Sequence, residues 1–264
     1  MFKTRLLSGI ILVAAALLTV ISGGWVLFFT CLALSMIAAG EFYLATGVRP
    51  EEKTFGRLDT AGYIGIALIY LFLILFPGRA QAMGIILAFL IIMFVYVFSY
   101  PKYDASKAFN AFIAVVYTGF MFSCLYQTRI LDMGHIHVWL IFISAWGSDT
   151  CAYCAGMLFG KHKMTPVLSP KKTWEGAVGG IAGTVILAVI YALVMKAPVA
   201  EYIIICIAGA VISMVGDLFA SAVKRNTGIK DYGRLIPGHG GILDRFDSII
   251  FTAPVIYYLS LLII

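Results

Sequence analysis

Long apolar runs alternate with short polar segments along the whole chain. A helix needs about 20 mostly apolar residues to cross the hydrocarbon core of a bilayer. We predict spans at residues 5–23, 25–46, 60–77, 82–100, 107–128, 135–159, 174–195, 201–223 and 242–264. The pattern therefore indicates an all-α, polytopic integral membrane protein with about nine transmembrane helices. We divide it into about five N-terminal spans, residues 1–130, and a C-terminal region of about four spans with two basic loops, residues 131–264.

The composition supports this class and excludes an ordinary soluble domain. Hydrophobic residues make up 62% of the chain and charged residues 12%, and the mean hydropathy is +0.99. Soluble domains are nearer a quarter charged and about half apolar. Orientation in a membrane would by itself explain most of the net charge of +6, and we expect no nucleic-acid partner.

The basic residues orient the spans. If the N-terminus is cytoplasmic, sixteen of the 19 Lys and Arg residues lie on the cytoplasmic side, and only Arg79, Arg129 and Lys196 lie on the other. An excess of Lys and Arg in cytoplasmic loops is the usual signature of membrane topology. We therefore predict a cytoplasmic N-terminus and an outside C-terminus.

Six carboxylates lie within or at the ends of predicted spans, where a central Asp costs about 2.5 to 3.5 kcal/mol and usually faces a cavity or a partner. They are Glu41, Asp149, Glu175, Asp217, Asp244 and Asp247. The predicted spans and their orientation place all six towards the cytoplasmic face. For Glu41 and Glu175 a structural role and a functional role remain equally open, because a carboxylate near a helix end can face water or pair with a loop lysine. For Asp217, Asp244 and Asp247 we favour function.

The last three acids also have a suggestive spacing. Asp244 and Asp247 are three residues apart, so they share one face of a helix, and they lie in its first turn, at the positive end of the helix dipole. Asp217, Ser221 and Lys224 follow i, i+4, i+7 along another helix. Oxygen-rich clusters of this kind suit Mg²⁺, which takes one or two carboxylates and completes its shell with water and substrate phosphate.

Two loops are equipped to bind phosphate. The first, residues 160–173, is rich in lysines and hydroxyls and ends in Thr173, an expected N-cap at a helix start where free N–H groups could hold an anion. The second, residues 224–241, is basic and ends in His239, Gly240 and Gly241. Consecutive glycines let backbone N–H groups converge into an anion-binding nest. No Walker or dinucleotide-binding motif is present in the sequence. We interpret Gly176, Gly179, Gly180 and Gly183 as close helix packing.

Three segments resemble a known family. The run Ser221 to Asp247, SAVKRNTGIKDYGRLIPGHGGILDRFD, resembles the signature of phosphatidate cytidylyltransferases (CDP-diacylglycerol synthases), with Lys-Arg, Lys-Asp, His-Gly-Gly and Asp-Arg-x-Asp at the family spacings. The segments 149–163 and 169–176 also resemble the family. The N-terminal half resembles it mainly as a hydrophobic bundle.

The resemblance implies the reaction of CTP with phosphatidate, giving CDP-diacylglycerol and pyrophosphate, by a homodimer in a bacterial inner membrane with its active site on the cytoplasmic side. It implies Mg²⁺ on Asp217 and Asp244, with Asp247 completing a second cation position or the outer shell, and it makes Lys224 catalytic. The substrate-binding residues that it implies are Asp149, Ser169, Lys171, Lys172, Thr173, Ser221, Arg225, Lys230, Asp231, His239, Gly240, Gly241 and Arg245. We expect the lysines and arginines of the second loop to bind triphosphate or lipid phosphate.

Two alternatives remain open at the level of sequence. A related CTP-dependent lipid cytidylyltransferase or kinase could use the same site on another lipid. A transporter with intramembrane carboxylates is a weaker alternative, since transporter charges tend to lie near the midplane on repeated, broken helices. No pocket for the cytosine base can be identified from the sequence.

The metal hypothesis makes a direct prediction at Asp244. Asp244→Asn should abolish turnover, because it removes a carboxylate charge from the predicted Mg²⁺ ligands, while folded protein is still recovered from the membrane. Activity of the purified variant checks this, and near-normal turnover would remove Asp244 from the set of metal ligands.

Overall fold

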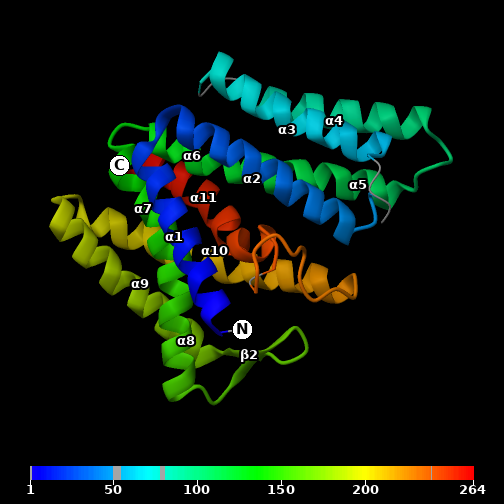
Figure 1. Ribbon diagram of the computed structural model, residues 1–264. Helices are drawn as coiled ribbons and strands as arrows, with labels where there is room; N and C mark the ends of the chain where they lie inside the picture. The colour runs from blue at the N-terminus through cyan, green and yellow to red at the C-terminus, as the bar shows by residue number, and fades with distance from the viewer. Residues whose placement is uncertain (1, 50–54, 78–80, 239) are drawn as a thin grey trace. The chain divides into compact units, whose positions relative to one another are not determined.

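The computed structural model describes residues 2–49, 55–77, 81–238 and 240–264 (Figure 1). The described part is almost entirely helical. Its helices are α1 (Phe2–Ser22), α2 (Gly24–Ala45), α3 (Arg57–Leu75), α4 (Gln81–Phe98), α5 (Ala105–Ala114), α6 (Phe122–Ile130), α7 (Gly134–Phe142), α8 (Ser148–Phe159), α9 (Trp174–Met195), α10 (Val199–Asn226) and α11 (Leu243–Ile263). Two π-helical segments, η1 (Val115–Met121) and η2 (Ile143–Gly147), continue α5 into α6 and α7 into α8.

Within the described residues, seven helices are long and apolar enough to cross a membrane. They are Gly24–Ala45, Arg57–Leu75, Gln81–Phe98, Ala105–Ile130, Trp174–Met195, Val199–Asn226 and Leu243–Ile263. This confirms an all-α, multi-pass membrane protein. The first predicted span corresponds to α1, of which Leu7–Ser22 is a shorter apolar helix, and the sixth corresponds to the unbroken helical run of α7, η2 and α8. The count of nine and the orientation of the termini stay predictions, and Arg79 lies outside the described residues.

The chain forms two compact units, each built from two stretches of sequence. The first unit comprises Met1–Ser123 and Thr227–Arg245, and the second comprises Cys124–Asn226 and Phe246–Ile264. The second basic loop therefore packs with the N-terminal helices, although it is close in sequence to α10. The expected division at residue 130 was based on spans alone and stays a prediction.

A buried ion pair ties the end of α2 to the start of α3 in the first unit. The Arg49 Nε lies 2.8 Å from Oδ2 of Asp59, whose side chain is fully buried, and another guanidinium N–H donates to the Tyr63 hydroxyl at 2.8 Å. The guanidinium also lies over the Phe55 ring, 4.5 Å from its centroid. Because removing one partner of a buried pair leaves an uncompensated charge, these contacts hold the two helix ends together.

Small residues bring α8 and α9 together in the second unit, where the two helices run side by side (Figure 1). A side chain on Gly179 would overlap the Cβ of Ala155, and one on Gly180 would lie 3.0 Å from the Cβ of Ala152. This confirms the interpretation of the glycine series as close helix packing.

A short hairpin joins these two helices. Its strands are β1 (Lys163–Thr165) and β2 (Ser169–Thr173), paired antiparallel with Lys163 opposite Thr173. Thr173 is the N-cap of α9, since its hydroxyl accepts the Gly176 N–H at 3.1 Å. The predicted cap is confirmed, and it fixes where the hairpin ends and the helix begins.

The contact between Gly179 and Ala155 predicts a specific loss of stability. Gly179→Ala should lower the free energy of unfolding by about 1 to 3 kcal/mol, because the added methyl group overpacks the α8–α9 contact. Thermal unfolding of the detergent-purified variant measures this. Adding Ala155→Gly should restore the wild-type Tm, and Ala182→Val, on an exposed position of α9, is the control that should change little. A wild-type Tm for Gly179→Ala would contradict the packing.

Candidate functional site

An ion pair lies where the hairpin meets α10 in the second unit. The Lys172 Nζ is 2.6 Å from Oδ2 of Asp217, and the two side chains are 23% and 33% exposed. Lys172 comes from β2, at the end of the predicted phosphate-binding loop, and Asp217 from the predicted metal-binding stripe. The structure therefore brings together one residue from each of two predicted groups.

Two further carboxylates surround this pair. Asp149 of α8 and Asp247 of α11 are both close enough to Asp217 for their charges to repel, and Lys224 attracts Asp247. Gly216 explains how α10 approaches α11 so closely, since a Cβ there would lie 2.9 Å from the Asp247 carbonyl oxygen. Asp149, Asp217 and Asp247 thus form one acidic cluster, with Lys172 and Lys224 as its cations.

Ser248 is a member of this cluster that the sequence analysis missed. Its hydroxyl donates to Oδ2 of Asp149 at 3.3 Å, and its backbone N–H donates to Oδ1 of Asp247 at 2.8 Å. Ser248 therefore connects two of the three acids. The available signal was a hydroxyl next to Asp247 at the start of an apolar run, which by itself is common at helix N-termini.

A pocket of about 520 Å³ opens beside this cluster. Its charged lining is Asp149, Lys163, Lys171, Lys172 and Asp217, and its apolar lining includes Ala152, Tyr153, Met157, Met164, Ala177 and Met214. We call it the lysine pocket. A lining that combines lysine ammonium groups with methionine and tyrosine side chains suits an amphiphilic anion.

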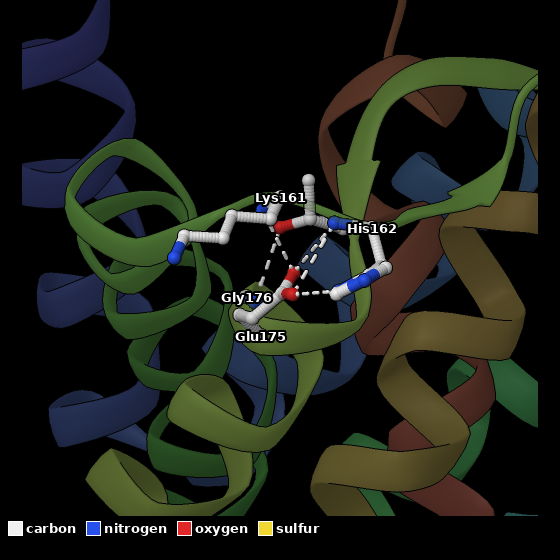
Figure 2. A network of polar contacts seen from close by, with 5 residues as sticks. Lys161, His162, Glu175 and Gly176 are labelled. Atoms are coloured by element: carbon white, nitrogen blue, oxygen red, sulfur yellow. Dashed lines mark hydrogen bonds and ion pairs between the residues drawn. The ribbon is translucent and has the colours of Figure 1, made fainter.

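Glu175 holds the hairpin that supplies these lysines (Figure 2). Its carboxylate accepts the backbone N–H of Lys161 at 3.1 Å and that of His162 at 3.2 Å, and its Oε1 lies 2.6 Å from Nδ1 of the His162 ring. Of the structural and the functional role that the sequence left open for Glu175, these contacts support the structural one: the carboxylate orients the start of the hairpin. Of the other residues predicted here, Thr173 caps α9 and lines the pocket, and Ser169 begins β2.

The second predicted loop folds around two carboxylates of the first unit. Both oxygens of Glu41, on α2, accept backbone N–H groups: Oε1 that of Ile242 at 2.9 Å, and Oε2 that of Leu243 at 2.8 Å. Oδ2 of Asp244 accepts the N–H groups of Tyr232 at 2.8 Å and Gly241 at 2.9 Å. The Gly241 N–H, predicted to face a bound phosphate, therefore has an internal acceptor. His239 lies outside the described residues.

The same loop lines a second pocket, of about 610 Å³. Its lining is Lys230, Asp231, Gly233, Arg234, Ile236, Gly238, Gly240 and Arg245. We call it the arginine pocket. Three cations and only one large apolar side chain line it, so it suits a water-soluble polyanion. The structure thus brings four of the predicted substrate-binding residues, Lys230, Asp231, Gly240 and Arg245, into one lining, and their contact with substrate stays a prediction.

The three predicted metal ligands fall in different units. Asp217 and Asp247 belong to the second, and Asp244 to the first. In the part of the chain that the structure describes, no group of three or more His, Cys, Asp or Glu side chains could hold a metal ion by itself. Mg²⁺ needs only one or two carboxylates when substrate phosphate and water complete its shell, and Asp217 with Asp247 fits that requirement. A metal role for Asp244 stays a prediction.

Two predicted substrate contacts remain untested by the geometry. Ser221 and Arg225 both lie on α10, on the stretch that carries Asp217 and Lys224. Their side chains are neither in the lining of the lysine pocket nor in that of the arginine pocket. Their assignment to substrate binding still depends on the resemblance alone.

Comparison with known proteins adds an independent line of evidence. The sequence model of the Cytidylyltransferase family matches residues 3–263. The chain is 34% identical to the phosphatidate cytidylyltransferase of Bacillus subtilis (strain 168), over 97% of each chain. It is 33% identical to the proteins of that name from Staphylococcus saprophyticus and Staphylococcus epidermidis, over 96% of this chain and 97% of theirs.

Because the Glu175 carboxylate holds the start of the hairpin, removing its charge should make this segment more mobile. Glu175→Gln should raise the rate of tryptic cleavage at Lys161 and Lys163 about tenfold, the equivalent of one charge-assisted hydrogen bond, because an amide replaces one acceptor oxygen by a donor. Mass spectrometry of the fragments measures this. Glu201→Gln, in the first turn of α10, is the matched control. Equal cleavage of the two variants would contradict the role of Glu175.

Proposed function

Because this chain belongs to the cytidylyltransferase family and transfers a cytidylyl group from CTP to phosphatidate, giving CDP-diacylglycerol and pyrophosphate, we propose that its two pockets divide the two substrates. The lysine pocket takes the phosphate of phosphatidate, and the arginine pocket takes the triphosphate of CTP. The observation that carries this proposal is the contrast in lining: apolar surface predominates in the lysine pocket, whereas four charged residues and a single large apolar side chain line the arginine pocket.

The lysine pocket suits a lipid because its two kinds of surface match the two parts of an amphiphile. Lys163, Lys171 and Lys172 offer ammonium groups to a phosphate. Met157 and Tyr153 are largely exposed on α8, which ends the sixth predicted span, and would offer apolar surface to acyl chains. Asp217 balances the charge of Lys172.

The arginine pocket suits a soluble nucleotide. Arg234 and Arg245 carry planar guanidinium groups, which bind phosphate oxygens in a bidentate manner, and Lys230 adds a third positive charge. Gly238 and Gly240 have positive φ values of 78° and 88°, a conformation that residues with a Cβ rarely adopt. These three cations, partly balanced by Asp231 in the same lining, would neutralise part of the negative charge of a triphosphate.

The chemistry requires alignment and charge neutralisation more than proton transfer. A phosphate oxygen of phosphatidate attacks the α-phosphorus of CTP, and the bond from that phosphorus to the bridging oxygen breaks, so that pyrophosphate leaves with the electron pair. The attacking oxygen is already ionised near neutral pH, so a strong general base is not needed. Lysine and arginine side chains lower the repulsion between the two anions and stabilise the departing pyrophosphate.

A Mg²⁺ ion fits this scheme on the acidic cluster. Asp217 and Asp247 would hold it, with Asp149 and Ser248 ordering the cluster through their hydrogen bond. When bound, Mg²⁺ neutralises phosphate charge and polarises phosphorus–oxygen bonds. Lys224 and Arg225, in the last turn of α10, add positive charge beside the cluster. A second cation, and a metal role for Asp244, belong to the same proposal.

The cellular setting follows from the substrates. We place the reaction on the cytoplasmic side of a bacterial inner membrane, where CTP is available and where the excess of Lys and Arg in the connecting loops also points. On the family resemblance, we also propose that the chain acts as a homodimer, which the mass of the detergent-solubilised protein tests.

Two neutralising substitutions separate the pockets in one assay. Purified protein is supplied with labelled CTP, phosphatidate and Mg²⁺, and CDP-diacylglycerol and pyrophosphate are measured. Lys171→Gln should raise the KM for phosphatidate about tenfold and leave the KM for CTP unchanged. Arg234→Gln should do the reverse, because each removes one charge-assisted contact to one phosphate group.

Each variant is the control for the other. If both variants raise the same KM, or if the effects are exchanged, the division of substrates between the pockets is wrong. If product forms only with a lipid other than phosphatidate, the lipid assignment itself is wrong.

A further inference from the structure

Glu41 is a buried carboxylate far in sequence from every residue that the reaction uses. It lies on α2, only 7% exposed, and its two oxygens accept the backbone N–H groups of Ile242 and Leu243 at 2.9 and 2.8 Å. Leu243 is the first residue of α11. The first N–H groups of a helix have no partner within the helix, so Glu41 supplies acceptors for the start of α11 from a different helix.

The loop before α11 has glycines at the positions where a side chain would overlap the Glu41 carboxylate. A Cβ on Gly233 or on Gly241 would overlap the Glu41 carboxylate, and one on Gly240 would lie 2.7 Å from Oδ2 of Asp244. Three glycines of the loop therefore leave room for two carboxylates. Gly240 also has a φ of 88°, a backbone conformation that residues other than glycine rarely adopt.

The same end of α2 holds the loop at a second point. The ring of Phe42, next to Glu41, stacks on Tyr232, with centroids 6.5 Å apart and an interplanar angle of 21°. The Tyr232 N–H in turn donates to Asp244. Residues 41 and 42 thus contact the loop near both ends of the segment 232–242. The residues that line the arginine pocket lie in this segment or within two residues of its ends. The exception is Arg245, which directly follows Asp244.

We propose that Glu41 is a positioning residue for the nucleotide: by holding the start of α11 and the glycine loop, it sets the placement of Arg234 and Arg245 in the arginine pocket. This inference rests on the proposed function, which assigns that pocket to CTP. A carboxylate is required, because both partners of Glu41 are donors and the positive end of the helix dipole favours a negative charge. An amide would turn one acceptor into a donor facing an N–H group.

The test is Glu41→Gln, compared with Glu201→Gln as the matched control. We expect the KM for CTP to rise at least about tenfold, as a small misplacement of binding groups can cause, with the KM for phosphatidate unchanged. A second readout is the increase in Tm on adding CTP without phosphatidate, which should be smaller than in wild type at the same CTP concentration. A purely structural role would reduce the amount of active protein and leave both KM values unchanged.

Gly241→Ala reaches the same contact from the loop side and keeps the proposal testable if Glu41→Gln does not fold. It should raise the KM for CTP in the same way. The inference is overturned if Glu41→Gln or Gly241→Ala, folded, has the CTP KM of Glu201→Gln while Arg234→Gln still raises it. If Arg234→Gln also leaves the KM for CTP unchanged, the assignment of the arginine pocket has failed instead.

Discussion

The backbone N–H groups at the start of a membrane helix and in the loop before it must find acceptors, and at α11 two carboxylates, those of Glu41 and Asp244, provide them. Glu41 accepts two such groups at the start of α11, and Asp244, in the first turn of the same helix, accepts two more from the preceding loop. Water is scarce near the hydrocarbon region, so unpaired N–H groups would be costly there. These bonds fix where the basic loop ends and the last helix begins, and the cations of the arginine pocket are placed accordingly.

In the second unit, the position of the hairpin depends on the close packing of α8 and α9. Glycines 176, 179, 180 and 183 let α9 lie against α8, and the hairpin between the two helices is closed at one end by the Thr173 cap and the Glu175 contacts. This hairpin carries three lysines, Lys163, Lys171 and Lys172, that line the lysine pocket together with apolar side chains. The acidic cluster beside them is stable because each carboxylate has a partner: Lys172 for Asp217, Ser248 for Asp149, and Lys224 for Asp247.

Local pattern was sufficient to predict the helical membrane class, the α9 cap and the glycine packing, because each depends on residues within a few turns of one another. It also drew attention to Asp217 and Asp247, since intramembrane acids are rare, and the structure brings these two side chains into one cluster. It could not pair Glu41 with Leu243, because 202 positions separate them and nothing in either segment specifies the other. It gave residues 160–173 no strands, since three-residue β1 is too short for a periodic signal. Ser248 was missed because a serine at a helix start is usually only a cap.

The apolar lining of the lysine pocket has three methionines, Met157, Met164 and Met214. Methionine side chains are unbranched and adaptable, so they fit apolar partners of differing shape, which suits lipids whose fatty acids vary in length and unsaturation. The same sulfur atoms are open to oxidation, and a sulfoxide is polar. Oxidation of these methionines would therefore make the apolar part of the pocket lining more polar, while the lysines would be unchanged.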